Sequence, residues 1–462
     1  MMPRVAAVAL AAAVVFLNTT GRVPADESLA ERLDKLEAQA TLLRQEIEQR
    51  KAQPLASDTK DAGRLPVTDA IVGMPALEPA IPPPGEVGPE LKKLLWKKGD
   101  VTITPYGFIT ASGIYETSQS AAGDYILYVL PPEIGGDPTM YFDAKSTRLG
   151  ATLAGPPVAC FGDATFGGRI EFDFQGQYVL PNKGGVLFRR AIVEIKNEEY
   201  RLSAGQDWEL LSPLYPGMLN YVPGSGGGNL GYRRAMFRAE RYYDVADDLL
   251  VTVEGSADAD IVSDFRDDPT IAGQTAGWPV LEGRVAVTMG ERKGPEALPV
   301  IVGVSGHVGQ QEFDFGSGIA ADHVIAETWS INGELRYPIT SRFGIAAEVF
   351  AGANLGSYMG GVLQGIDRGT HEAIRSRGGW VDVWYDWIPK KLHSHVGYSI
   401  DDPVDSDLTD GRRYNHFIFG NLTYDVTKDL LVGFEASAWK TLWVGLDDGN
   451  TLRFELQTRY SF

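Results

Sequence analysis

The sequence contains a single cysteine, Cys160, among 462 residues. One cysteine cannot form an intramolecular disulfide, and it excludes zinc sites that are built from several cysteines. Beyond the first 25 residues no run of eighteen apolar residues occurs, so no hydrophobic helix long enough to cross a bilayer is expected. Basic residues number 42 against 61 acidic ones, which gives a formal net charge of −19 and argues against nucleic acid as a partner.

The sequence also lacks the short motifs of common enzyme classes. It has no Gly-x-Ser-x-Gly turn, no phosphate-binding Walker loop and no His-Glu-x-x-His pair. His393 and His395 would share one face of a strand and could supply half of a metal site. No third ligand is apparent beside them, so an ordinary structural role is favoured. We therefore expect no enzymatic activity, no cofactor and no metal centre.

Aromatic residues and glycine are abundant, with 19 Tyr, 19 Phe, 9 Trp and 53 Gly, which favours many short strands joined by turns. The last twelve residues, 451–462, alternate strictly between apolar and polar side chains, and this period of two predicts a strand. A strand of a soluble sandwich would show the same alternation. The terminal aromatic, Phe462, favours instead a closed barrel in lipid, with an apolar outer face and a wet lumen.

The N-terminal region divides into segments of different composition. Residues 1–25 have Arg4 followed by an apolar run, which predicts a cleaved secretory signal; an uncleaved anchor helix is the alternative. Residues 26–53 carry apolar side chains at alternating spacings of four and three, the pattern of a coiled coil. A single amphipathic helix packed on another domain would also fit. A trimeric coil is preferred, although the residues at its core positions do not decide the number of chains.

A proline-rich linker follows at residues 54–99, and its composition favours an extended chain over a packed domain. A short helical piece is expected within it at 90–98, with Trp96 at a membrane edge. The remaining residues, 100–462, are rich in alternating segments and are predicted to form an all-β domain, a sixteen-stranded antiparallel transmembrane barrel. The predicted strands are 101–116, 146–154, 164–176, 186–196, 200–208, 233–243, 249–257, 278–290, 300–313, 324–337, 343–354, 379–388, 393–400, 413–424, 430–442 and 451–462.

The connections between these strands are alternately short and long. Short turns on one side and long polar loops on the other are typical of outer-membrane barrels. An even number of strands places both ends of the barrel on the short-turn side, which predicts that the coil lies in the periplasm.

Side-chain alternation also predicts which residues face the lumen. In 168–175, Ile170 and Phe172 fall on one face while Glu171 falls on the other. A lipid-facing arginine or lysine costs about 2–4 kcal/mol at the bilayer midplane, so the ionic faces must point inward. The predicted pore-lining residues are Arg148, Arg169, Arg190, Arg201, Arg234, Arg238, Arg284, Glu171, Asp173 and Asp207. The same rule turns Arg336, Asp382, Asp386, Arg453 and Glu455 inward.

Sixteen strands enclose a space too wide for side chains to fill, so the lumen is expected to be an aqueous channel. Its arginines either form a basic ladder that orders small charged solutes or pair with neighbouring acids in a solvated wall. The loop 209–232 is long and contains apolar residues that would be awkward in water. It is predicted to fold inward as a constriction loop, rather than to lie on the surface, through Glu209, Tyr215, Asn220 and Tyr221.

Three stretches and the aromatic C-terminus resemble the trimeric general bacterial porins. The stretches are FDAKSTRLGATL (142–153), GGRIEFDFQG (167–176) and RRAIVEIKNEEYRLSAGQDW (189–208). With the N-terminal coil, the chain is most similar to the DcaP-like branch. The resemblance implies a sixteen-stranded trimeric barrel in the outer membrane of a Gram-negative-type bacterium, a constriction loop after Gly205–Trp208, and uptake of small, often anionic, solutes. Asp207 and Glu209 place acid beside that loop, and the linker is long; both features depart from the pattern.

The expected function is passive diffusion of small hydrophilic solutes, anions among them, through a charged lumen. The expected partners are two further copies of the chain, outer-membrane lipid, lipopolysaccharide and small solutes. The alternative is a structural protein in which the barrel anchors a tether made by the coil and linker. Net charge does not settle ion selectivity, because acids outside the lumen count equally in it.

Overall fold

The computed structural model describes residues 95–162, 164–176, 184–261, 276–291, 298–315 and 322–462. These residues belong to one compact unit, Leu65–Phe462. The predicted signal segment, the coiled coil and nearly all of the linker lie outside the described residues. In the part of the chain that is described, no helix is long and apolar enough to cross a membrane.

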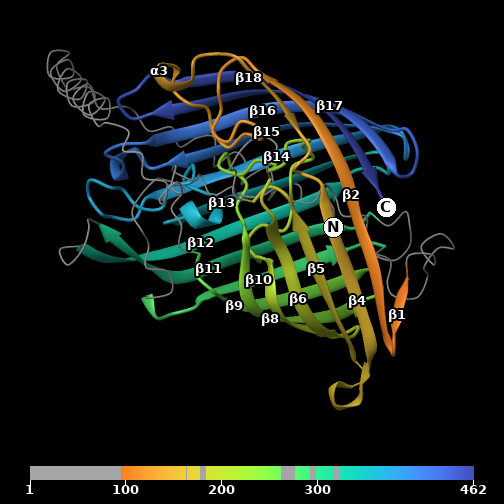
Figure 1. The fold of residues 1–462 in the computed structure, drawn as a ribbon. Coiled ribbons are helices and arrows are strands. Elements are labelled where there is room, and N and C mark those ends of the chain that lie inside the picture. Colours follow the sequence, from red (N-terminus) through yellow and green to blue (C-terminus); the bar gives the residue numbers. More distant parts are fainter. Residues whose placement is uncertain (1–94, 163, 177–183, 262–275, 292–297, 316–321) are drawn as a thin grey trace, which may run out of the picture. The chain divides into compact units, whose positions relative to one another are not determined.

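Sixteen antiparallel strands of the described residues close into a barrel (Figure 1). Each strand pairs with its neighbours in the chain, and β18 closes the ring on β2 from Arg453↔Glu116 to Ser461↔Phe108. The barrel strands are β2 (Val101–Glu116), β4 (Arg148–Val158), β5 (Ala164–Asp173), β6 (Leu187–Lys196), β7 (Tyr200–Trp208), β8 (Arg233–Ala246), β9 (Leu249–Asp258), β10 (Val280–Met289), β11 (Val300–Phe315), β12 (Asp322–Pro338), β13 (Phe343–Ala353), β14 (Arg375–Ile388), β15 (Leu392–Pro403), β16 (Arg412–Asp425), β17 (Leu430–Trp443) and β18 (Gly449–Ser461).

Short elements complete the described structure. They are β1 (Trp96–Lys98), β3 (Thr139–Asp143), α3 (Pro132–Gly135) and the 3-10 turns η2 (Ala159–Phe161), η5 (Gly356–Tyr358) and η6 (Asp405–Asp407). Both β1 and β3 pair with β2, at its beginning and its end respectively.

All sixteen predicted strands are confirmed, with ends that agree to within four residues. The helical piece expected at 90–98 is wrong where the structure describes it, because Trp96–Lys98 is the strand β1. Gly99 adopts a left-handed φ of 63°, and the chain reverses there so that Lys98 pairs with Val101. This hairpin gives the backbone of residues 96–98 partners on β2, which a helix could not do. Strand β3 was not predicted either; it lies in a segment interpreted as a loop.

The two faces of the wall differ as the alternation predicts. On β18, Leu452 and Leu456 are 49% and 57% exposed on the outer face, whereas Arg453 and Glu455 are 2% and 3% exposed on the inner face. Because the surroundings of the barrel contact these outer side chains, the apolar exposed face of β18 suits a hydrocarbon environment.

The packed core consists of loops folded against the inner wall. Tyr125 and Leu127, Val222, and Met359 and Leu363 form one buried apolar cluster from three different loops. A second cluster packs loop side chains on inward-facing aromatic rings of the wall: Ile126, Val129, Met218, Phe417, Phe419 and Trp439. Part of the inner face is therefore apolar, and loops cover it there.

Candidate functional site

A cavity of about 770 Å³ lies inside the barrel. The first half of the loop 209–232 lines it together with strands from most of the ring. The predicted constriction residues Glu209, Tyr215, Asn220 and Tyr221 are all placed on its lining. Six arginines line it, each from a different strand (β4, β6, β8, β10, β12 and β18): Arg148, Arg190, Arg238, Arg284, Arg336 and Arg459.

Buried carboxylates of the wall hold the loop in place. Four backbone amides of the loop each donate a hydrogen bond to an acid on a different strand. The pairs are Leu210 with Glu282 on β10 (2.7 Å), Leu214 with Glu348 on β13 (2.8 Å), Gly217 with Asp382 on β14 (3.1 Å) and Leu219 with Glu435 on β17 (2.7 Å). The loop thus follows the inner wall, and these four acids act as acceptors for its backbone. Sequence alternation turned Asp382 inward but did not reveal this role, which depends on the path of a loop.

The tip of the loop is in close contact with the wall at Gly217. Its amide donates to Asp382, its carbonyl accepts a hydrogen bond from the Asn421 amide at 2.6 Å, and the ring of His395 lies directly beside its Cα. A Cβ at this position would overlap the His395 ring, so the approach requires glycine.

Adjacent arginines on β6 both point into the barrel. Strict alternation predicts Arg190 inward and Arg189 outward, but Arg189 is the extra residue of a bulge in β6: Arg190 pairs with Glu171 and Phe188 with Phe172. Arg189 is fully buried and pairs with Glu171 at 2.7 Å and Asp173 at 2.8 Å. Sequence reasoning missed Arg189. The signal was two consecutive arginines in a strand, because without a bulge one of them would face lipid.

The same acids connect the wall to the constriction loop. The hydroxyl of Tyr221 donates to Asp173 at 2.6 Å, beside the guanidinium of Arg189. Glu171 also faces Arg148 at 3.8 Å. The predicted pore residues Glu171 and Asp173 are therefore buried in an ion-pair network, at 2% and 0% exposure, and act on the loop rather than on open solvent.

Further ion pairs lie beside this network, on strands β6, β7 and β8. Arg190 meets Asp207 at 2.7 Å, and Arg201 bridges Glu194 at 2.6 Å and Glu240 at 2.5 Å. The structure places Arg190 on the cavity, whereas Arg201 and Asp207 lie in the wall beside it.

The other predicted arginines have separate surroundings. Arg234 is 1% exposed, pairs with Glu209 at the root of the loop and stacks on Tyr358 at 4.0 Å, so it is not at the lumen surface. Arg169 lies over the ring of Tyr106 at 5.7 Å. Arg284 lines the cavity between Glu254 and Glu334, and Arg238 lines it close to the carbonyl of Trp208.

Two of the cavity arginines form no salt bridge with an acid of the described residues. Among the described residues, neither Arg336 nor Arg459 is in direct contact with a carboxylate, although Asp425 on β16 attracts Arg459 electrostatically. Arg336 lies over Trp384 at 5.2 Å, and Arg459 lies over Phe108 at 5.5 Å. Aromatic faces attract such cations but do not neutralise them.

The part of the cavity wall between these two arginines, formed by β14, β15 and β16, carries acids and histidines. His393 lies between Asp386 at 2.6 Å and Asp425 at 3.1 Å, and His395 contacts Asp382 at 2.8 Å. The two nitrogens of His393 face different acids. The pair therefore joins the wall carboxylates in a hydrogen-bonded network.

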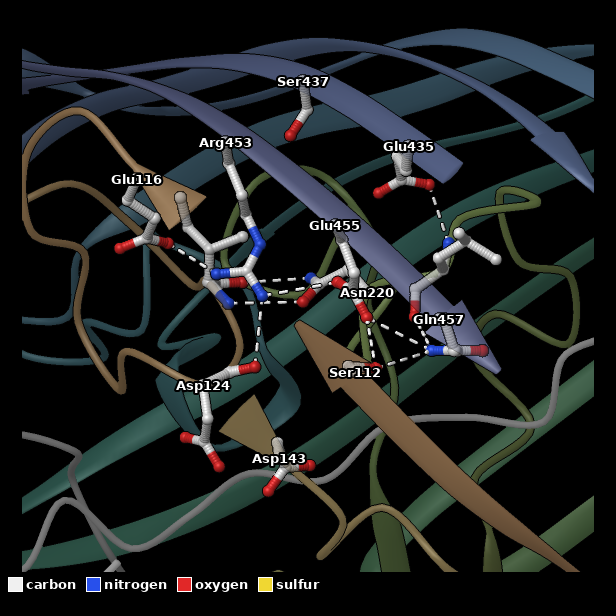
Figure 2. Close-up of polar contacts among 12 residues, drawn as sticks. Ser112, Glu116, Asp124, Asp143, Asn220, Glu435, Ser437, Arg453, Glu455 and Gln457 are labelled. Atoms are coloured by element: carbon white, nitrogen blue, oxygen red, sulfur yellow. Dashed lines mark hydrogen bonds and ion pairs between the residues drawn. The ribbon is translucent and has the colours of Figure 1, made fainter. Parts of the chain in front are cut away.

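Arg453 of β18 secures a second inward loop, the segment between β2 and β3 (Figure 2). Its guanidinium donates to Glu116 at 2.5 Å and to the backbone carbonyls of Gly123 and Asp124, each at 3.1 Å. Gln457 on the same strand donates to the carbonyl of Leu219 at 3.2 Å. One strand therefore anchors two of the loops that shape the lumen.

No protein-family model matches the sequence, and no curated protein matches it either. Among solved structures, the outer membrane channel DcaP of Acinetobacter baumannii aligns with a TM-score of 0.60 and 19% identity, over 79% of this chain and 99% of that one. The fold is that of a sixteen-stranded porin barrel. An anion-selective porin from Comamonas acidovorans aligns with a TM-score of 0.50 and 13% identity, over 78% of this chain and 100% of that one. The predicted resemblance to DcaP-like porins is confirmed at the level of the fold.

Proposed function

We propose that this chain is an outer-membrane channel through which small hydrophilic solutes diffuse passively. The observation that carries the proposal is the cavity of about 770 Å³, enclosed by the barrel and lined by arginines and by the inward loop 209–232. The apolar outer face supports a place in lipid, and the fold shared with DcaP of Acinetobacter baumannii supports the channel.

Anions are the favoured solutes. Five of the eight acids on the cavity lining lie beside a lysine or an arginine: Asp124, Asp143, Glu209, Glu254 and Glu455. The other three, Asp382, Asp386 and Asp425, lie beside histidines. Arg336 and Arg459, in contrast, form no salt bridge with a carboxylate of the described residues, although Asp425 attracts Arg459 from a greater distance. Their positive potential attracts small anions and repels cations of the same size.

The proposed assembly is a homotrimer surrounded by outer-membrane lipid and lipopolysaccharide. The resemblance of the sequence to trimeric porins and the coiled-coil spacing at 26–53 support it. Strand β2 begins at Val101, where Thr102 pairs with Ala154 of β4, close to the short connection between β4 and β5. A periplasmic coil would follow from that arrangement. The mass of the full chain in detergent, measured by sedimentation, tests the trimer.

Liposome swelling tests the channel itself. Proteoliposomes containing the full chain are diluted into isosmotic solutions of sugars and of sodium salts of small organic acids. The proposal predicts swelling that slows as the solute grows and is faster for the organic anions than for neutral solutes of equal size. Absence of swelling with protein shown to be folded would contradict it and would favour the tether function.

A further inference from the structure

Three metal-ligating side chains converge on the outer face of the barrel, away from the lumen. They are Glu312 and Asp314 of β11 and His323 of β12, and one ligand atom of each lies within 4.8 Å of the others. The Nδ1 atom of His323 is 2.5 Å from the Asp314 carboxylate and 3.5 Å from that of Glu312. One imidazole nitrogen therefore faces both acids from the same side.

The pairing of the two strands produces this convergence. Asp314 is the direct cross-strand partner of His323, and Glu312 is two residues away on the same face. Phe313, between the two acids, points inward and packs with Ala326 and Ile366 in a buried cluster. Because the inner face of the hairpin is packed at this height, the three outer side chains project from a backbone that is already fixed.

The height of the group along the strands places it outside the hydrocarbon. On the same outer face, Val308 pairs with Trp329, and these side chains are 59% and 41% exposed. Glu312 and Asp314 lie four and six residues further along β11, roughly 13–20 Å at the usual rise of a strand. Beyond that pair the outer face becomes mostly polar, with Gln310 opposite Glu327 and Asp314 opposite His323. Ile325, opposite Glu312, is the last exposed apolar side chain of this face, at 58%. In a membrane barrel the apolar band ends at the interface. The three ligands therefore lie at or above the level of the lipid headgroups, in reach of dissolved cations.

We propose that Glu312, Asp314 and His323 form a site for a divalent transition-metal ion, with zinc as its representative. One imidazole nitrogen and two carboxylates are a ligand set that suits zinc and similar ions, whereas calcium and magnesium take oxygen ligands. The two carboxylates also match the charge of a divalent ion. Three protein ligands leave at least one coordination position for water. This inference does not depend on channel activity.

Isothermal titration of the full chain in detergent, with any affinity tag removed, tests the site with zinc chloride. We expect one zinc ion per chain with at least tenfold weaker binding in His323→Ala and in Asp314→Asn. Glu327→Gln is the matched control, because Glu327 is an exposed acid on the same strand as His323 and outside the group; its zinc affinity should equal that of the original chain. Calcium chloride should give no comparable heat.

A second measurement, thermal unfolding, distinguishes zinc binding at this site from zinc binding elsewhere on the protein. Zinc should raise the midpoint of thermal unfolding of the original chain and of Glu327→Gln, and should not raise that of His323→Ala. Equal zinc affinity in all four proteins would overturn the proposal. So would the absence of binding by the original chain, which would leave His323 as an ion-pair partner of Asp314. The substituted side chains are on the outer surface, and elution and circular dichroism establish that each variant is folded.

Discussion

At the scale of single residues, charge burial explains the most important departure from simple alternation. Arg189 and Arg190 are consecutive in β6, and the bulge at Arg189 keeps both guanidinium groups out of lipid. Arg189 then neutralises Glu171 and Asp173, and it lies beside the hydroxyl of Tyr221 in the constriction loop. A single irregularity in the ladder thus links the wall to the loop.

Arg189→Met should destabilise the barrel by about 3–5 kcal/mol, because it leaves two carboxylates buried without their cation. Urea unfolding in detergent, followed by intrinsic fluorescence, measures the effect. Arg413→Met removes an exposed pair with Asp405 at 4.0 Å and should change stability by less than about 1 kcal/mol. Equal midpoints for the two variants would contradict the role assigned to Arg189.

A second residue-scale prediction concerns Asp367, in the loop between β13 and β14. Burial alone would raise the pKa of its carboxyl, but hydrogen bonds from the amides of Thr409 (2.7 Å), Thr370 (2.9 Å) and Gly369 (3.0 Å) lower the pKa below its ordinary value. A depressed pKa means that the ionised group stabilises the loop above its unfolded pKa of about 3.9. This contribution is lost as the pH falls through the lower pKa of the folded state.

Hydrogen-exchange protection factors for residues 367–374 and 409 test this point. Protection should be high at neutral pH and should fall in acid, and Asp367→Asn should already lower it at neutral pH. Protection that is unchanged in the variant would show that the charge of Asp367 does not hold the loop.

At the scale of elements, the constriction loop depends on its contact with the wall at Gly217. Gly217→Ala would place a methyl group where the His395 ring lies, although non-bonded carbon atoms rest about 3.5–4.0 Å apart. The tip of the loop must then move into the lumen, so single-channel conductance should fall and current noise should rise. Gly420→Ala is the control, since its Cβ would have only ordinary contacts, at 3.7 Å and beyond. Conductance that falls equally in both variants would contradict this account of the tip.

Strands and loops also differ in how far the sequence predicts them. The outer and inner faces of β18 follow from alternation alone, because lipid and water impose opposite demands on neighbouring side chains. The contacts of the loops involve partners far apart in the chain, such as Leu219 with Glu435 and Asn220 with Ile126, and no local period encodes them. The inward rings of Phe417 and Phe419 were unexpected for the same reason, since only the loops above them make an apolar inner face favourable.

At the scale of the whole molecule, ion selectivity should depend on the cavity arginines that form no salt bridge with an acid of the described residues. The double variant Arg336→Gln and Arg459→Gln removes two positive charges from the cavity lining and leaves the salt bridges of the lining acids intact. Its reversal potential under a salt gradient should therefore move away from the anion side, towards zero or beyond. Arg413→Gln, at an exposed position of β16, should leave the potential unchanged. An unchanged potential in the double variant would show that other charges set the selectivity.

The most direct test of the channel is single-channel conductance of the purified full chain in a planar bilayer, with the reversal potential measured under a potassium chloride gradient. We predict stable conductance steps that occur in groups of three and a reversal potential on the anion side. Steps that occur singly would contradict the trimer, and a cation-side potential would contradict the anion preference. No conductance from protein shown to be folded would contradict the proposal that the barrel is a channel.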